Sequence, residues 1–220
     1  MQANYRQRIR MRFSKEGPAR YISHLDLSRT IERALIRAKV PLAYTQGFNP
    51  RPKMQFANAL PLGFTSEGEI VDIWLKEIQN PQETLLALSK IMAPGISLSS
   101  AEEVDLSSPA LQTMTEFSRY AVYLSGDFTS EQIEDRVSIL LEKPAIIRVR
   151  RDKEYDLRPL IADLLVIDTG EDLTQLTMKL LLEPTRIGRP EDVLKALRID
   201  PLTVRIHRQE IILAKTESDD

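Results

Sequence analysis

Hydrophobic and polar side chains alternate along residues 5–13, whose sequence is YRQRIRMRF. A period of two is typical of a half-buried β-strand, because successive side chains of a strand point to opposite faces. The segment therefore predicts a strand with one mostly apolar face and one face made of arginines. The arginine face consists of Arg6, Arg8, Arg10 and Arg12.

The remainder of the first half alternates between helical and extended patterns. A capping-box-like start at Ser23 is followed by apolar residues at helical spacing, and this pattern ends before Pro41. A second helix begins at Asn80 and Pro81, because Asn is a good N-cap and Pro fits the first helical turn. The predicted order is β-α-β-β-α-β, with the later strands at 53–58, 69–76 and 96–104.

The same order is predicted again after a polar, proline-containing segment. Strands are expected at 119–125, 145–151 and 174–183, and residues 202–213 hold one strand or a hairpin. Helices are expected after the cap Thr129 and from Pro190, which fits the first helical position. Within 154–168, Pro159 argues against a central strand, because proline cannot donate to the ladder.

Two β-α-β-β-α-β units predict an α+β fold of two tandem ferredoxin-like domains with antiparallel sheets. The expected divisions are a basic domain at 1–105, a linker at 106–116, an acidic domain at 117–213 and a disordered tail at 214–220.

Composition limits the classes of function. The chain has no cysteine, which excludes disulfides, thiolate catalysis and cysteine-ligated iron–sulfur clusters within it. It has no run of about 18 apolar residues and no apolar signal at its start, so we expect a cytoplasmic protein without a membrane partner.

Charge is distributed unevenly along the chain. Residues 1–53 hold 12 basic and three acidic side chains, a net charge of +9, so the rest must carry −11 to give the total of −2. Such a division predicts a first half that faces a polyanion, or a basic half that docks on an acidic one.

The arginine face and a neighbouring loop are the candidate polyanion contacts. Arginine binds phosphate through two hydrogen bonds and stacks on bases, although a solvated face or pairing with acids of the second domain would also explain the pattern. The loop 45–56, TQGFNPRPKMQF, combines Gly47 and two prolines, which predicts a rigid shape. Its Phe48 is either a base-stacking ring or a core plug. Asn49, Arg51 and Lys53 complete this candidate contact.

His24 is one of only two histidines, and Arg20 and Tyr21 lie just before it. A helix N-terminus attracts anions, so His24 would suit a phosphate contact or a general base, and a purely structural role is the alternative. No spacing of metal ligands is present in the sequence, so no metal is expected.

The first half closely resembles a family of bacterial domains of unknown function that are linked to radical SAM proteins. The resemblance is carried by His24-Leu25-Asp26, Arg33-Ala34, Gly47-Phe48-Asn49-Pro50, Leu60-Pro61-Leu62-Gly63 and Ser66-Glu67-Gly68-Glu69. Members lie beside, or are fused to, a B12-binding-type radical SAM protein, and their genes often lie near a ribonuclease G-type gene and ribosomal protein genes. The resemblance implies a separate radical SAM partner, which would carry the iron–sulfur cluster and S-adenosylmethionine, because this chain has no cysteine.

The leading interpretation is a non-catalytic accessory protein that binds or presents tRNA or rRNA to a radical SAM enzyme. One alternative is a metal-independent RNA-processing nuclease that uses His24, and another is an adaptor that binds only protein. The expected nucleic-acid contacts are Arg6, Arg8, Arg10, Arg12, Arg20, His24, Phe48, Asn49, Arg51 and Lys53.

Overall fold

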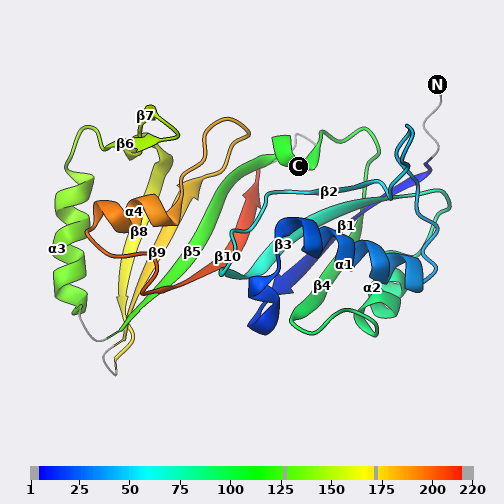
Figure 1. Cartoon of the computed structure of the whole chain (residues 1–220), viewed down its shortest axis with the longest axis horizontal. Coiled ribbons are helices and arrows are strands. Elements are labelled where there is room, and N and C mark those ends of the chain that lie inside the picture. The colour runs from blue at the N-terminus through cyan, green and yellow to red at the C-terminus, as the bar shows by residue number, and fades with distance from the viewer. Residues whose placement is uncertain (1–4, 126–127, 171–172, 215–220) are drawn as a thin grey trace. The chain divides into compact units, whose positions relative to one another are not determined.

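The computed structural model describes residues 5–125, 128–170 and 173–214. The chain forms two compact units, Met1–Met114 and Thr115–Asp220, here called unit 1 and unit 2 (Figure 1). Both units mix helices with antiparallel strands, so the α+β class and the antiparallel pairing are confirmed. No helix within the described ranges combines the length and the apolar character that a membrane crossing requires. The predicted tail, 214–220, lies outside the described residues except for Ala214.

Within residues 5–114, unit 1 contains four strands and two α-helices. In space the strands follow the order β4-β1-β3-β2, and each neighbouring pair is antiparallel. The elements are β1 (Gln7–Lys15), α1 (His24–Arg37), β2 (Met54–Phe56), β3 (Thr65–Leu75), α2 (Pro81–Ser89) and β4 (Ile96–Val104).

The core of unit 1 lies between β1 and its helices. The Ser23 side chain accepts a hydrogen bond from the Asp26 backbone N–H, which caps the first turn of α1 as the sequence indicates. Leu27, Ile31 and Leu35 of α1 are buried in one cluster with the alternate β1 side chains Ile9, Met11 and Phe13. The apolar side chains that gave the period-two pattern of β1 and the helical pattern of α1 thus pack together in the core.

Unit 2 has a similar element order. Its strands follow the order β10-β5-β9-β8, again with antiparallel neighbours. Thr129 and Gln132 form a complete capping box at the start of α3. The elements are β5 (Thr115–Ser125), α3 (Ser130–Leu141), β8 (Ile161–Asp168), β9 (Leu173–Leu181), α4 (Pro190–Ala196) and β10 (Arg205–Leu213).

The second strand of unit 2 differs from the prediction. Residues 145–151 were expected in the sheet, but β6 (Ile147–Arg150) pairs with β7 (Lys153–Asp156) as a separate hairpin. The sheet strand is β8, which begins just after Pro159. This proline lies in a 3-10 helix, Arg158–Leu160, so it occupies no ladder position and does not prevent the strand that follows.

Tyr155 joins the β6–β7 hairpin to α4. Its hydroxyl donates a hydrogen bond of 2.7 Å to Asp192 Oδ2. Burial of the ring raises the pKa of Tyr155 to about 12, and the hydrogen bond to Asp192 acts in the same direction. The side chain is therefore protonated, and available as a donor, throughout the neutral range.

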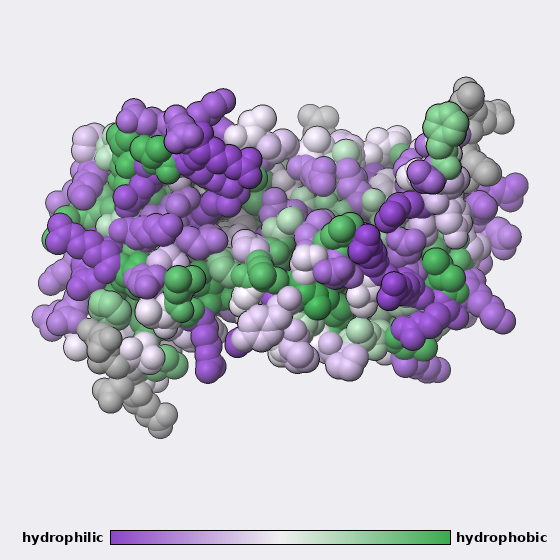
Figure 2. Space-filling view, in the orientation of Figure 1, coloured by the Kyte–Doolittle hydropathy of each residue, from purple (hydrophilic) through white to green (hydrophobic). Residues whose placement is uncertain are grey.

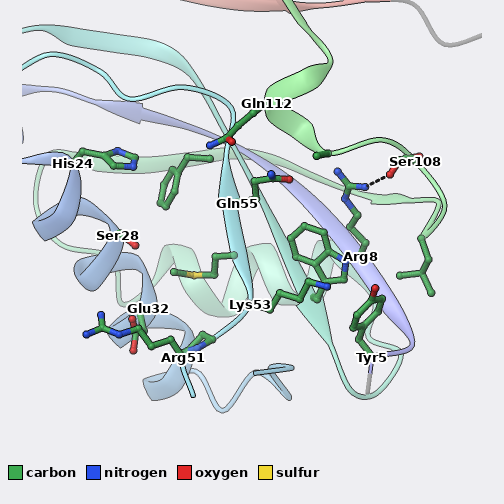
Figure 3. Close-up of a pocket in the computed structure, with 16 residues that line it drawn as sticks. Tyr5, Arg8, His24, Ser28, Glu32, Arg51, Lys53, Gln55, Ser108 and Gln112 are labelled. Atoms are coloured by element: carbon green, nitrogen blue, oxygen red, sulfur yellow. Dashed lines mark hydrogen bonds between the residues drawn. The ribbon is translucent and has the colours of Figure 1, made fainter. Parts of the chain in front are cut away.

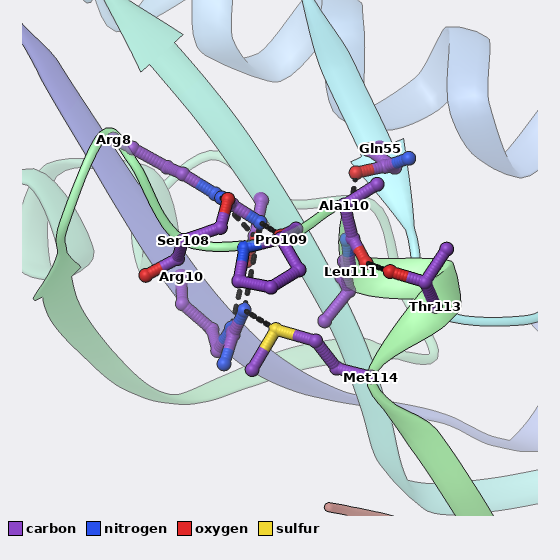
Figure 4. A network of polar contacts seen from close by, with 10 residues as sticks. Arg8, Arg10, Gln55, Ser108, Pro109, Ala110, Leu111, Thr113 and Met114 are labelled. Carbon is purple, nitrogen blue, oxygen red and sulfur yellow. Dashed lines mark hydrogen bonds and ion pairs between the residues drawn. The ribbon is translucent and has the colours of Figure 1, made fainter. Parts of the chain in front are cut away.

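Residues 105–114, which we call the strap, fold back onto unit 1 (Figure 4). Arg8 donates to the carbonyl oxygens of Ser108 at 2.8 Å and Pro109 at 3.0 Å. The Leu111 backbone N–H donates to Gln55 Oε1 at 2.9 Å. Most of the segment expected as a linker is therefore held by defined contacts, and its end, from Thr115, is already part of β5.

Asp72 binds both central arginines of the β1 alternation. Arg8 Nη2 lies 2.5 Å from Asp72 Oδ2, and Arg10 Nε lies 2.9 Å from Asp72 Oδ1. The exposed fractions are 1 % for Arg8, 6 % for Arg10 and 0 % for Asp72. The expectation that four arginines line an open sheet face is therefore corrected for Arg8 and Arg10, which are buried and bound within the protein.

Replacement of Asp72 by alanine should lower the free energy of unfolding by about 3–5 kcal/mol, because it leaves two buried guanidinium groups without an anion. Chemical denaturation followed by circular dichroism measures this change. Arg119→Ala, which breaks an exposed ion pair with Glu210, is the matched control and should cost less than about 1 kcal/mol. Equal effects of the two substitutions would contradict a structural role for Asp72.

Candidate nucleic-acid interface

A cavity of about 690 Å³ opens in unit 1 (Figure 3). Its walls come from α1, β2 and the strap, together with residues of β1 and β3 and the segment just before β2. The lining is mixed in polarity and includes three basic side chains and one acidic side chain. The lining residues are Tyr5, Arg8, His24, Ser28, Glu32, Arg51, Pro52, Lys53, Met54, Gln55, Phe56, Trp74, Leu106, Ser108, Ala110 and Gln112.

The α1 wall presents His24, Ser28 and Glu32 to the cavity. Residues four apart lie on the same face of a helix, so these three form one polar stripe. His24 is the first residue of α1, and its ring meets the ring of Phe56 edge-on, with centroids 5.0 Å apart. The imidazole is exposed at the cavity rather than buried in the core.

The loop before β2 is closed at its base. Thr45 N–H donates to the Arg51 carbonyl oxygen at 2.8 Å, and Arg51 N–H donates to Thr45 Oγ1 at 3.1 Å. Gly47 has φ of +138°, a conformation that residues with a side chain rarely adopt. The backbone bonds and this glycine together define the shape of the loop.

Phe48 lies near the tip of this loop, and its side chain is fully exposed, at 105 %. The core-plug interpretation of Phe48 is therefore wrong. A fully exposed phenylalanine next to exposed Asn49 and Arg51 is an accessible surface for stacking.

The Lys53 side chain lies between two aromatic rings that line the cavity, those of Tyr5 and Trp74. Its Nζ atom lies 3.9 Å from the ring centroid of Tyr5 and 4.8 Å from that of Trp74. The Arg8 guanidinium lies over the same Trp74 ring at 4.9 Å. These cation–π contacts fix the position of the ammonium group without neutralising its charge.

The cavity brings together four of the residues expected as nucleic-acid contacts, namely Arg8, His24, Arg51 and Lys53. Arg20 does not line it and instead lies over the ring of Tyr21, at 4.5 Å. Arg6 is exposed and Arg12 is half-buried, so both remain candidate contacts outside the cavity. The lining also includes Tyr5, Gln55, Trp74 and Gln112, which were not among the expected contacts.

Ser28 and Glu32 were also missed, although their spacing from His24 was visible in the sequence. Their position depends on which face of α1 is left uncovered. Within the described residues, no three or more His, Asp or Glu side chains converge in a metal-binding arrangement.

The chain belongs to the family described as "Uncharacterized protein conserved in bacteria (DUF2344)", which matches residues 8–190. No curated protein shows significant sequence similarity to the chain.

Solved structures show a likeness in fold at low sequence identity. One is a chain of a Cbf5-Nop10-Gar1 complex, with a TM-score of 0.50 and 9% identity over 92% of this chain and 48% of that one. Another belongs to an H/ACA RNP bound to a substrate RNA containing 2'-deoxyuridine, with a TM-score of 0.48 and 8% identity over 95% of this chain and 48% of that one. The chain thus spans about half the length of these structural relatives.

Replacement of Phe48 by alanine should change the free energy of unfolding by less than about 0.5 kcal/mol, because the ring is fully exposed. Phe56→Ala is the matched control. That ring is 8 % exposed and lies against Phe13 and His24, so its loss should cost about 3–5 kcal/mol. Thermal and chemical denaturation measure both, and a large loss for Phe48→Ala would show that the ring is structural.

Proposed function

We propose that this protein is a non-catalytic RNA-binding protein, and that the cavity of unit 1 and its adjoining loop hold a single-stranded segment of RNA. The observation that carries the proposal is the cavity itself, which Arg51, Lys53 and Gln55 line, together with the exposed ring of Phe48 on the loop that leads to them. A basic surface combined with an unoccupied aromatic face is the usual arrangement for binding single strands.

Each group has a definite task in this proposal. Arg51, which is exposed, binds a phosphate, and Phe48 stacks on a base. Gln55 Oε1 already accepts the Leu111 N–H, which leaves its amide N–H groups as donors at the cavity wall. Because the loop is closed by hydrogen bonds before a ligand arrives, little ordering entropy is lost on binding.

His24 contributes a contact rather than catalysis in this proposal. Its ring is exposed at the cavity and meets Phe56 edge-on, and it is the only histidine among the lining residues. Cleavage at a 2′-hydroxyl needs a base and a group that stabilises the developing charge, both held on the reacting atoms. We therefore assign the groups that line the cavity to binding of RNA and not to its cleavage.

A radical SAM enzyme is the proposed recipient of the bound RNA. This part rests on the resemblance of the stretch around His24 and Gly47 to radical-SAM-linked domains. With no cysteine in the chain, the partner would supply the iron–sulfur cluster and S-adenosylmethionine.

We also propose the finer fold assignment, in which each unit is ferredoxin-like. The support is that both units share one element order, and that in each the last strand lies beside the first.

Binding of fluorescein-labelled oligouridine, followed by anisotropy across a salt series, tests the RNA proposal. Arg51→Ala should weaken binding about tenfold and reduce the salt slope by about 0.7, because one phosphate contact is lost. Phe48→Ala should weaken binding about tenfold while leaving the salt slope unchanged. The control is Arg33→Ala, an exposed arginine of α1 outside the cavity.

Two results would overturn the proposal. If Arg51→Ala and Phe48→Ala bind RNA as tightly as Arg33→Ala, the cavity is not the RNA site. If the wild-type protein converts RNA to fragments that end in a 2′,3′-cyclic phosphate, and His24→Ala abolishes this, the protein is a nuclease.

The partner is tested by purifying the tagged full chain from its native host at low ionic strength. The protein that co-purifies should contain iron and acid-labile sulfide and should bind S-adenosylmethionine. A stable partner that lacks all three would contradict the radical SAM part while leaving the RNA part intact.

A further inference from the structure

A second basic site lies in unit 2 and contains none of the residues that the sequence indicated as nucleic-acid contacts. A cavity of about 320 Å³ is formed by the C-terminal end of α3, the start of β6 and the C-terminal end of α4. An adjoining cavity of about 250 Å³ shares Lys143 and Arg198 with it. We call this continuous surface the basic groove, and its cations are Lys143, Arg148, Lys195 and Arg198.

The basic groove is positively charged, although unit 2 as a whole carries a net negative charge. Residues 115–220 hold 16 basic and 21 acidic side chains, a net charge of −5. None of the described residues that line either cavity is acidic. Hydrophilic side chains gather over α4 and the β6–β7 hairpin in Figure 2.

The four cations have no hydrogen-bond or ion-pair partner for their side chains among the residues that the structure describes. Arg136, which lines the adjoining cavity, differs from them, because its Nη1 donates to the Leu197 carbonyl oxygen at 3.2 Å and its guanidinium lies over Phe128. The Nε atom of Arg148 is buried and finds no acceptor in the same part of the chain. Arg189 Nε and Glu191 Oε2, which line neither cavity, are buried without a partner in the same way, so the case for a ligand rests on the four unpaired charges of the groove.

Helix dipoles explain only part of this charge. Basic side chains are common at helix C-termini, where each helix contributes the equivalent of roughly −0.5 of an elementary charge. Two helix ends therefore offset about one of the four cations. The remaining positive charge is large for so small a surface, and an anionic ligand would neutralise it.

We propose that the basic groove binds backbone phosphates of RNA, as a second RNA contact in addition to the cavity of unit 1. The identity of the ligand as RNA rests on the proposed function. The groove itself rests on the independent geometry of unit 2.

The test compares two pairs of substitutions that change charge by the same amount. The groove pair is Lys195→Gln with Arg198→Asn, and the control pair is Lys153→Gln with Arg151→Asn on the exposed β6–β7 turn. Arg198 and Arg151 both have positive φ, at 60° and 48°, so asparagine suits both positions. The two double variants therefore match in charge and in backbone conformation.

Affinity for labelled oligouridine is measured across a salt series. The groove pair should bind about tenfold more weakly than wild type, with a salt slope reduced by about 1.4 for two lost phosphate contacts. The control pair should change affinity by less than about twofold. If the two pairs lose affinity equally, the effect is one of total charge and the groove is not a site.

Hydrogen–deuterium exchange of the wild-type protein with oligouridine separates this inference from the proposed function. Protection of 140–148 and 195–199 supports the groove, and protection of 45–56 supports the cavity of unit 1. Protection of the groove alone would overturn the proposed cavity and leave the groove standing. Protection of the cavity alone, or of the groove only by an acidic protein partner and not by RNA, would overturn the groove.

Discussion

The carboxylate of Asp72 is the interaction on which unit 1 depends. It is fully buried, and it is the anion that permits Arg8 and Arg10 to be buried beside it. Ionised groups removed from water are stable only when they are paired and their remaining N–H groups are satisfied. Arg8 satisfies its remaining donors through the carbonyl oxygens of Ser108 and Pro109, so the ion pair also fixes the strap. One carboxylate therefore determines both the sheet face and a wall of the cavity.

This arrangement determines which charges of the cavity are accessible to a ligand. Because Arg8 is buried and bound to Asp72, the charges accessible to a ligand are those of Arg51 and Lys53, opposed by Glu32. Lys53 is held by two aromatic rings, whereas Arg51 is exposed on a loop with a defined backbone. The site thus combines one fixed cation and one accessible cation with polar groups of α1 and β2. Such a surface favours a ligand with separate anionic and planar parts, as a nucleotide has.

Local patterns in the sequence predicted the elements, and long-range contacts explain what they missed. The alternation of residues 5–13 correctly predicted β1, because the period of two that marks a strand can be recognised within the segment itself. It could not show that the arginine face is covered, because the cover lies about a hundred residues away in the strap and the counter-ion lies in β3. Likewise His24, Arg51 and Lys53 were chosen by residue type, but Trp74 and Gln112 join them only through tertiary structure. Pro159 argued only against a central strand, and β8, which begins just after it, is the last strand in the order β10-β5-β9-β8.

The strap also has a consequence for where this chain can be divided. The last strand of unit 1 ends at Val104, and an ordinary domain boundary would be placed there. A fragment that ended at that residue would lose Ser108 and Pro109, and two donors of a buried guanidinium would have no acceptor. It would also lose Leu111, whose N–H holds Gln55. The smallest autonomous piece of the N-terminal half must therefore extend through Met114, ten residues beyond its last strand.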